Sequence, residues 1–405
     1  MQQTDVIILG GGLVGLALAA ALDPSGLSST VIDPADPDLR LDTTFDGRTS
    51  AVSSSSMRMF DTVGISRHFP VPGGPIAKIR TSDGLAPGSL TFDAGEDGEP
   101  LGWMHENRNL RAALRGRAEA GKAITLRYKT NATHIDRSEH GVSVMLDNGD
   151  TLRAPLLVSA EGRNSATREA AGIRIAKWSY QHRAIVSVLR HEKPHDGIAY
   201  EIFYPSGPFA LLPMTDDEVG PRSAIVWSIR EADAPGLLAL TDEQFACEAE
   251  VAMGGFLGHV SMLAPRSSYP LGFHHAARIT DNRLALVGDA AHAVHPIAGQ
   301  GLNLGFRDAA ALAQVLVEGA RLGLDLGDRQ LLDRYQRWRS LDTLMVAMST
   351  DSLTRLYSIP GKTAAAVRRL GMGMVDRIGP LKDRLMAEAR GTSGELPLLL
   401  RGLPI

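Results

Sequence analysis

The segment from Val6 to Leu22, VIILGGGLVGLALAAAL, constrains the fold more than any other part of the chain. It predicts a short buried strand, a glycine turn and an apolar helix, the unit that opens a parallel α/β sheet. Gly10, Gly12 and Gly15 have the spacing G-x-G-x-x-G. In this motif the first glycine permits a tight turn, the second lets a pyrophosphate approach the backbone, and the third lets the helix pack on the strand. We therefore predict a nucleotide-binding unit.

A second predicted strand supports this assignment. It is SSTVIDP, and it ends in Asp33, about 20 residues after Gly15, where a ribose-binding carboxylate is expected. The helix N-terminus supplies unpaired N–H groups and partial positive charge for phosphates. The motif does not distinguish NAD from FAD. A glycine turn that only packs a helix on a sheet is the alternative, and it leaves Asp33 unexplained.

Composition narrows the class of protein. The chain has 405 residues, 44% hydrophobic and 22% charged, as in soluble globular proteins with more than one lobe. A net charge of -4 gives no reason to expect nucleic-acid binding. The single cysteine, Cys247, excludes an internal disulfide framework and favours a cytoplasmic location. Asp5 and three consecutive glycines argue against a signal peptide or membrane span near the N-terminus.

The middle of the chain changes character twice. Thr49–Val63 and Gly102–Ala120 are predicted to be helices, and residues 132–157 a strand meander with an Asn148-Gly149 hairpin turn. From about 176 to 275, strand-like segments such as AIVSVLR, AYEIFYP and SAIVWSI alternate with turns, which predicts an antiparallel sheet. Its aromatic residues could together line an apolar pocket.

These patterns predict a mixed α/β fold. It comprises a discontinuous Rossmann-like domain, an inserted antiparallel-sheet substrate domain and a C-terminal helical tail. The tail interleaves apolar and basic residues, so it is a candidate membrane-surface face, helical cap or oligomer contact. The predicted ranges are 1–70, 101–175 and 276–345 for the nucleotide domain, 71–100 and 176–275 for the substrate domain, and 346–405 for the tail.

A second glycine-rich loop, GDAAHAVHPIAGQGLNLG, runs from Gly288 to Gly305. It follows the apolar run LALV and leads into a helix-like stretch, although the chain has no second G-x-G-x-x-G unit after a strand. His292 and His295 have no third ligand at a credible spacing, so no metal site is expected.

The two loops together resemble the single-component flavin monooxygenases of the para-hydroxybenzoate hydroxylase type. The likeness rests on the first glycine motif with Asp33, on EGRNSATR at 161–168 and on VGDAAHAVHP at 287–296. The stretch HPIAGQGLNLGFRD at 295–308 is similar to the signature of the ubiquinone-biosynthesis hydroxylase branch. The resemblance spans most of the chain. One departure is Glu161, where the family usually has aspartate before the glycine.

The resemblance implies FAD as the cofactor and NAD(P)H or an external reductase as the electron donor. It implies hydroxylation of an aromatic ring with O2 through a flavin C4a-hydroperoxide. The implied substrate is a prenylated phenol of ubiquinone biosynthesis. A soluble aromatic in catabolism, or a flavin-binding scaffold role, is the alternative. The implied location is cytoplasmic and peripheral on the inner membrane, with other quinone-biosynthesis proteins or a second copy of the chain as candidate partners.

By position, the resemblance also assigns cofactor-binding residues. Asp33 would hold the adenosine ribose, Arg48 would reach the phosphates or the ribityl chain, and Asp289 would bond the ribityl chain. His295 is a candidate catalytic residue for the phenol proton, although a structural histidine is the alternative; Pro296 is the candidate beside it. The residues that would cradle the pyrophosphate are Gly10, Gly12, Leu13, Val14 and Gly15, and those that would face the flavin ring are Pro296, Gly299, Gly301, Leu302 and Asn303.

Overall fold

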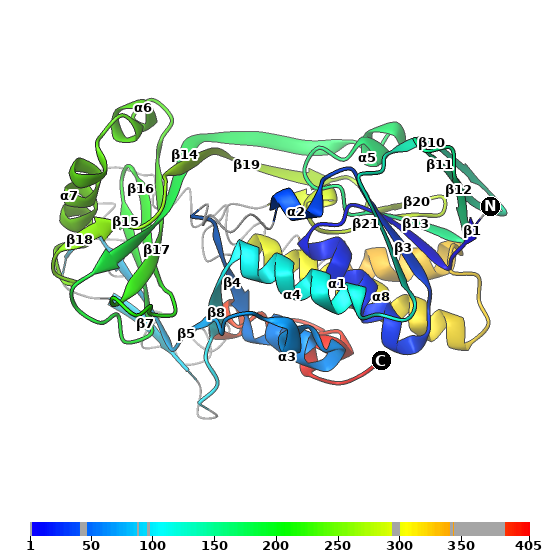
Figure 1. Ribbon diagram of the computed structural model, residues 1–405, viewed down its shortest axis with the longest axis horizontal. Coiled ribbons are helices and arrows are strands. Elements are labelled where there is room, and N and C mark those ends of the chain that lie inside the picture. Colours follow the sequence, from blue (N-terminus) through cyan, green and yellow to red (C-terminus); the bar gives the residue numbers. More distant parts are fainter. Residues whose placement is uncertain are drawn as a thin grey trace.

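The computed structural model describes residues 2–40, 47–86, 89–94, 98–293, 300–340, 343 and 385–405. A large sheet lies at one end of the elongated molecule, and a parallel sheet with the N-terminus lies at the other (Figure 1). The mixed α/β fold is as predicted from the sequence.

The parallel sheet forms the core of the nucleotide-binding end. Its strand order is β20 (Thr280–Asp281), β21 (Leu284–Leu286), β13 (Leu156–Ser159), β2 (Val6–Leu9), β3 (Ser29–Asp33) and β9 (Ile124–Tyr128). Strands β21, β13, β2, β3 and β9 run parallel. The sheet shares one buried apolar core with α1 (Leu13–Leu22), α4 (Asn107–Glu119) and α8 (Gln300–Arg321). Burial on both faces explains why β2 is an unbroken apolar run.

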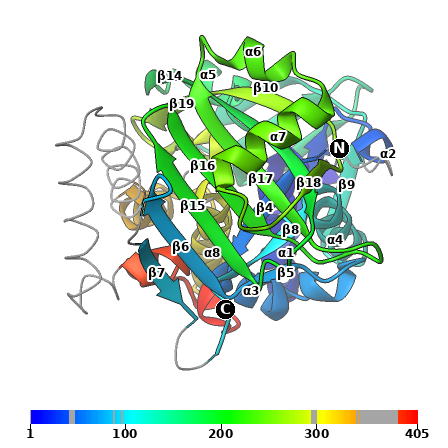
Figure 2. The ribbon, with the colours of Figure 1, turned by 90° about the vertical axis from the view of Figure 1, so that its left-hand side faces the viewer.

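A nine-stranded sheet forms the other end. Its strand order is β22 (His292–Ala293), β19 (Ser267–Ala276), β14 (Ile175–His191), β17 (Arg222–Arg230), β16 (Gly207–Pro213), β15 (Ile198–Tyr204), β6 (Lys78–Asp83) and β7 (Ser89–Asp93), with β18 (Val260–Met262) beside β14. Strands β14 and β19 connect the two ends of the molecule (Figure 1). Helices α6 (Ala234–Leu238) and α7 (Asp242–Met253) cover the outer face (Figure 2). The opposite face of the nine-stranded sheet lines the cavity described below.

Two smaller sheets complete the described strands. One has the order β1 (Gln2–Gln3), β12 (Thr151–Ala154), β11 (Gly141–Leu146) and β10 (Ala132–Ser138), and the other β4 (Thr49–Ser53), β8 (Gly102–Glu106) and β5 (Gly74–Ile76). The predicted Asn148-Gly149 turn joins β11 and β12, which pair antiparallel. The short helices α2 (Pro37–Arg40) and α5 (Ala166–Ala170) follow β3 and β13.

Two segments predicted to be single helices begin as strands. Residues 49–53 form β4 before α3 (Ser54–Val63), and residues 102–106 form β8 before α4. The two strands pair antiparallel from Thr49↔Glu106 to Ser53↔Gly102. The Ser53 hydroxyl then caps α3 by accepting from the Ser56 amide. The helical prediction was wrong there because pairing between distant segments overrides the local apolar pattern.

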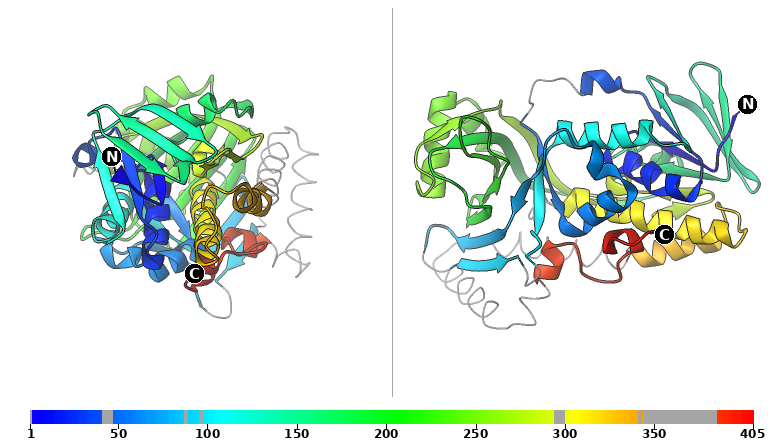
Figure 3. Two further views of the ribbon diagram at one scale, coloured as in Figure 1. Left: turned by 90° about the vertical axis from the view of Figure 1, so that its right-hand side faces the viewer. Right: turned by 60° about the horizontal axis from the view of Figure 1, so that its bottom comes forward.

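The domain ranges stay a prediction. The boundaries at 175/176 and 275/276 fall where β14 begins and β19 ends. Residues 346–384 of the predicted tail lie outside the described residues. The last residues lie beside α3 and α8 (Figure 3), where Leu399 and Leu400 are buried. No helix within the described part of the chain is long and apolar enough to cross a membrane.

His105 on β8 makes stability depend on pH. It is 3% exposed and stacks on Phe69 at 4.3 Å, and neither ring nitrogen has a hydrogen-bond partner in the described chain. Burial lowers the pKa of His105 to about 4 from 6.5, so the unfolded chain takes up a proton before the folded one does. The stabilisation is therefore complete above pH 6.5 and is lost as the pH falls toward 4.

We expect His105→Phe to remove part of this acid sensitivity, since phenylalanine keeps a ring against Phe69 but does not titrate. Between pH 7 and pH 5 the free energy of unfolding should fall by about 2 kcal/mol less in the variant than in the wild type. Urea unfolding at the two pH values measures the difference. Equal losses in both proteins would show that His105 does not contribute. His274, whose pKa burial also lowers to about 4, leaves some acid sensitivity in both proteins.

Candidate active site

In the first glycine loop, Gly12 has free space for a side chain, whereas Gly10 and Gly15 do not. Gly10 has a φ of +107°, and a Cβ there would lie 2.3 Å from the Ala160 carbonyl oxygen. A Cβ on Gly15 would lie 2.0 Å from the Gly10 carbonyl oxygen. Around a Cβ on Gly12 there is nothing within 4 Å. Two glycines are therefore required by packing, whereas Gly12 faces free space at the N-terminus of α1.

Asp33 stands beside this loop at the end of β3 and is 5% exposed. Its carboxylate accepts hydrogen bonds from the backbone N–H groups of Gly11 and Ala35, each at 2.8 Å. A small cavity of about 40 Å³ adjoins it, with Arg111, Arg115 and Tyr128 in its wall. A carboxylate and two guanidinium groups suit the hydroxyl and phosphate groups of a nucleotide.

The second glycine loop packs directly on the first. Val14, in the first turn of α1, lies against both Gly288 and Gly305. A Cβ on Gly305 would lie 2.6 Å from Val14 Cγ2, and one on Gly288 would lie 3.2 Å from it. One extended ligand can therefore contact both loops, although they are far apart in the sequence.

A buried carboxylate holds the second loop in place. Asp308 on α8 accepts from the Gly288 N–H at 2.9 Å, from His292 Nε2 at 2.7 Å and from Arg339 Nε at 2.7 Å. Burial alone would raise the pKa of Asp308, but His292 and Arg339 outweigh it and the pKa lies below its usual value. Asp308 was not assigned from the sequence. Its signal was the charged pair Arg307-Asp308 within an otherwise apolar helical run.

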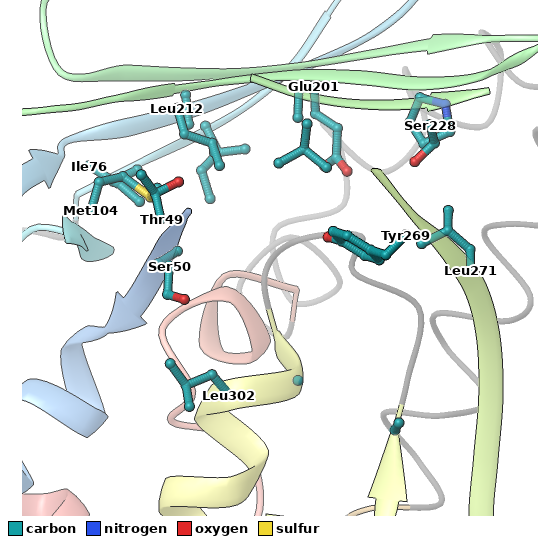
Figure 4. Close-up of a pocket in the computed structure, with 18 of the residues that line it drawn as sticks. Thr49, Ser50, Ile76, Met104, Glu201, Leu212, Ser228, Tyr269, Leu271 and Leu302 are labelled. Atoms are coloured by element: carbon teal, nitrogen blue, oxygen red, sulfur yellow. The ribbon is translucent and has the colours of Figure 1, made fainter. Parts of the chain in front are cut away.

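A cavity of about 340 Å³ lies between the second loop and the inner face of the nine-stranded sheet (Figure 4). The loop side and the sheet side meet there, as they must if a cofactor ring is to face a substrate. The lining residues outside the nine-stranded sheet include Thr49, Ser50 and Ala51 of β4, Arg163, Asp289, and Gly301 and Leu302 of α8. Those in the sheet include Glu201, Ala210, Leu212, Val226, Ser228, Tyr269, Leu271 and Ala293.

Asp289 was predicted for the site and lies in the wall of this cavity. Its carboxylate is 3.7 Å from the Arg163 guanidinium. Burial raises the pKa of Asp289, while Arg163 and His292 partly oppose the shift. The 45% of its side chain that is accessible belongs to the cavity wall.

The first turn of α8 also faces the cavity. Gly301 and Leu302 line it, and nothing lies within 4 Å of a Cβ placed on Gly301. The Asn303 side chain instead joins α8 to β4, because it accepts from the Ser53 N–H at 2.9 Å and donates to the Ala51 carbonyl at 3.0 Å. Helix α8 begins at Gln300 in the described residues, and the first turn of a helix presents partial positive charge.

Other predicted residues have different outcomes. The Arg48 side chain is exposed just before β4, and the cavity lining that the structure describes includes Thr49 and Ser50 rather than Arg48. His295, Pro296 and Gly299 lie outside the described residues.

Glu161, where the family usually has aspartate, has a local structural role. Its carboxylate accepts from the hydroxyls of Ser159 and Ser165 and from the Thr167 N–H at the start of α5. Arg168 does not pair with it and donates to the Ala290 carbonyl at 3.0 Å. Both residues thus support the strand and loop that border the cavity.

A family model described as an FAD binding domain matches residues 3–347. The chain is 46% identical over 407 residues to the ubiquinone hydroxylase UbiL of Rhodospirillum rubrum, covering 100% of this chain and 94% of that protein. The chain belongs to the FAD-dependent hydroxylases of ubiquinone biosynthesis. It is also 34% identical over 394 residues to the 3-demethoxyubiquinol 3-hydroxylase of Escherichia coli, covering 96% and 99% of the two chains.

A solved structure agrees on the fold of this hydroxylase. The p-nitrophenol 4-monooxygenase PnpA of Pseudomonas putida superposes with a TM-score of 0.78 at 17% identity, covering 98% of this chain and 100% of that one. The resemblance found in the sequence, the fold class and FAD as cofactor are therefore confirmed.

The residues of the hydroxylase fit FAD. The open space at Gly12 and at Gly301, on the N-termini of α1 and α8, suits a cofactor that carries negative charge at both places. When bound, FAD supplies the activation of O2 that ring hydroxylation requires. Two loops joined through Val14 would hold it, and the largely apolar lining of the cavity would limit the access of water to the reacting ring.

Proposed function

We propose that this hydroxylase acts on the aromatic ring of a prenylated phenol in ubiquinone biosynthesis, with O2 as the source of the new oxygen. One observation carries the proposal: a cavity of about 340 Å³ has Asp289 and the first turn of α8 on one side and strand residues of the nine-stranded sheet, most of them apolar, on the other. This volume is in the range of cavities that bind small molecules. The names of its relatives, a ubiquinone hydroxylase and a 3-demethoxyubiquinol 3-hydroxylase, support a quinone precursor.

The proposal assigns parts of FAD to the two loops. The pyrophosphate lies at the N-terminus of α1 beside Gly12, and Asp33 holds the adenosine ribose. Asp289 bonds the ribityl chain, and the amides of the first turn of α8 stabilise negative charge on the flavin ring. The roles of Arg48, His295, Pro296 and Gly299 rest on the resemblance alone.

The proposal also includes NAD(P)H or an external reductase as electron donor and a cytoplasmic location, peripheral on the inner membrane. A prenylated substrate resides in a membrane, which supports such a location. Flotation of the full chain with anionic vesicles tests it. A chain that stays in the soluble fraction at low salt would contradict the membrane association.

Deletion of the gene in its host, followed by mass spectrometry of the quinone fraction, tests the function. We expect a prenylated precursor that lacks one ring oxygen to accumulate and ubiquinone to fall. The wild-type gene should restore ubiquinone. An unchanged quinone profile would contradict the proposal and favour a soluble aromatic substrate. A third outcome would favour the scaffold role: the precursor accumulates in the deletion strain, but the purified holoenzyme does not consume reductant when a phenol is added.

A further inference from the structure

The cavity wall carries hydroxyl groups on both sides. Thr49 and Ser50 stand beside Ile76, Met104 and Leu212 on one side, and Ser228 and Tyr269 stand beside Leu271 on the other (Figure 4). The first turn of α8, with Leu302, lies below both. The Ser50 hydroxyl already donates to Asn107 Oδ1 at 2.7 Å.

Strand register places the two hydroxyl residues on one face of the sheet. Tyr269 on β19 pairs with Ala184 on β14, and Ala184 pairs in turn with Ser228 on β17. Residues in register on adjacent strands point to the same face, and strands lie about 4.8 Å apart, so the two Cα atoms are about 10 Å apart.

Neither hydroxyl has a hydrogen-bond partner within the described part of the chain. Ser228 is 2% exposed and Tyr269 is 38% exposed. The Tyr204 hydroxyl on the same sheet, by contrast, donates to the Ala252 carbonyl at 2.5 Å. Buried hydroxyl groups in native proteins are nearly always paired, so the unpaired hydroxyl of Ser228 beside the cavity points to a ligand. Tyr269 is more exposed and adds a second hydroxyl group to the same wall.

Tyr269 is suited to donate a hydrogen bond. Burial raises the pKa of its hydroxyl, and the nearby Arg163 only partly opposes the shift, so the phenol keeps its proton at neutral pH. A protonated phenol donates to an oxygen that carries lone pairs or negative charge.

We propose that Tyr269 and Ser228 bind an oxygen substituent on the substrate ring, with Tyr269 as the donor. The substrate class is then a phenol or quinol whose oxygen points to β19 and β17 and whose apolar substituents point to Ile76, Met104 and Leu212. This inference rests on the proposed function and names the groups that select its substrate. A site that hydrogen-bonds an oxygen rejects an analogue without it far more strongly than an apolar wall rejects one extra methyl group.

The test compares two probes that differ in this oxygen. Purified holoenzyme is titrated with 3-methylphenol and with 1,3-dimethylbenzene, in which a methyl group replaces the phenol hydroxyl and no oxygen remains, and the change in flavin absorbance gives each dissociation constant. The wild type should prefer the phenol by about tenfold or more, the value of about one hydrogen bond. Tyr269→Phe should reduce this preference to about twofold or less without weakening 1,3-dimethylbenzene binding.

Tyr204→Phe is the matched control, because it removes a tyrosine hydroxyl from the same sheet outside the cavity and should leave both dissociation constants unchanged. A Tyr269→Phe protein with the wild-type preference, or one that weakens both probes equally, would overturn the inference. If Tyr269→Phe does not hold FAD, the same titrations are made with Ser228→Ala. A ratio of dissociation constants equal to that of the wild type would contradict the inference, and a smaller ratio would support it. The two proposals can fail separately. If the purified wild-type protein prefers the phenol but deletion of the gene leaves the quinone profile unchanged, the proposed pathway is refuted and this inference stands.

Discussion

Gly12→Val is expected to abolish FAD binding while the apoprotein stays folded. A Cβ at this position meets nothing within 4 Å, so the new side chain occupies the space that the proposed pyrophosphate needs. Its backbone, with φ −78° and ψ −173°, is open to any residue, so the free energy of unfolding of the apoprotein should change by no more than about 1 kcal/mol. We expect FAD to bind at least about 100-fold more weakly, a loss near 3 kcal/mol.

Gly15→Val is the matched control, with the opposite expectation. A Cβ there would lie 2.0 Å from the Gly10 carbonyl oxygen, so α1 could not keep its packing on β2 and the apoprotein itself should fail to fold. Circular dichroism on heating measures stability, and quenching of FAD fluorescence measures binding. Wild-type affinity for FAD in Gly12→Val would place the pyrophosphate elsewhere.

Asp308→Ala is expected to destabilise the holoenzyme by about 3–5 kcal/mol, because it leaves a buried guanidinium and a buried amide without their acceptor. Arg339 is 1% exposed, and the Gly288 N–H starts the loop that carries Asp289. Urea unfolding gives the change in free energy. Asp93→Ala, which removes an exposed carboxylate paired with Lys78, should cost no more than about 1 kcal/mol. Equal effects of the two substitutions would show that the buried network does not stabilise the loop.

The same network has a defined pH dependence. The folded-state pKa of Asp308 lies below its usual value, so its stabilisation is present above the unfolded-state pKa and is lost as the pH falls through the folded-state pKa. The difference in unfolding free energy between the wild type and Asp308→Asn should therefore be largest near neutral pH and should shrink in acid. A difference that grows in acid would contradict a charged Asp308.

Features that depend on residues close together in the sequence could be predicted without the structure. The glycine spacing predicted the turn at Gly10 and the close packing at Gly15, since steric limits act within a few residues. The helix beginning near Gly301 followed from the same kind of local pattern. Asp289 was assigned by resemblance, and the structure places it in the cavity wall.

Features that depend on contacts between residues far apart in the sequence could not be predicted from it. The strands at 49–53 and 102–106 were predicted as helices, because each becomes a strand only by pairing with the other. The contact that the Asn303 side chain makes between α8 and β4 was not predicted, because its partners at Ser53 and Ala51 are far away in the sequence. Asp308 was missed because its partners His292 and Arg339 come from other segments.

By itself, the sequence determined the nucleotide-binding unit, the two glycine loops and, through resemblance, the family and its cofactor. Local steric rules and a short motif suffice for these, because they depend on residues close together in the chain. Only the tertiary structure decided that Val14 joins the two loops and that Tyr269 and Ser228 line one cavity. Strand register sets which side chains share a face, and register depends on the packing of the whole sheet. The chemistry that selects a substrate is therefore visible only in the folded chain.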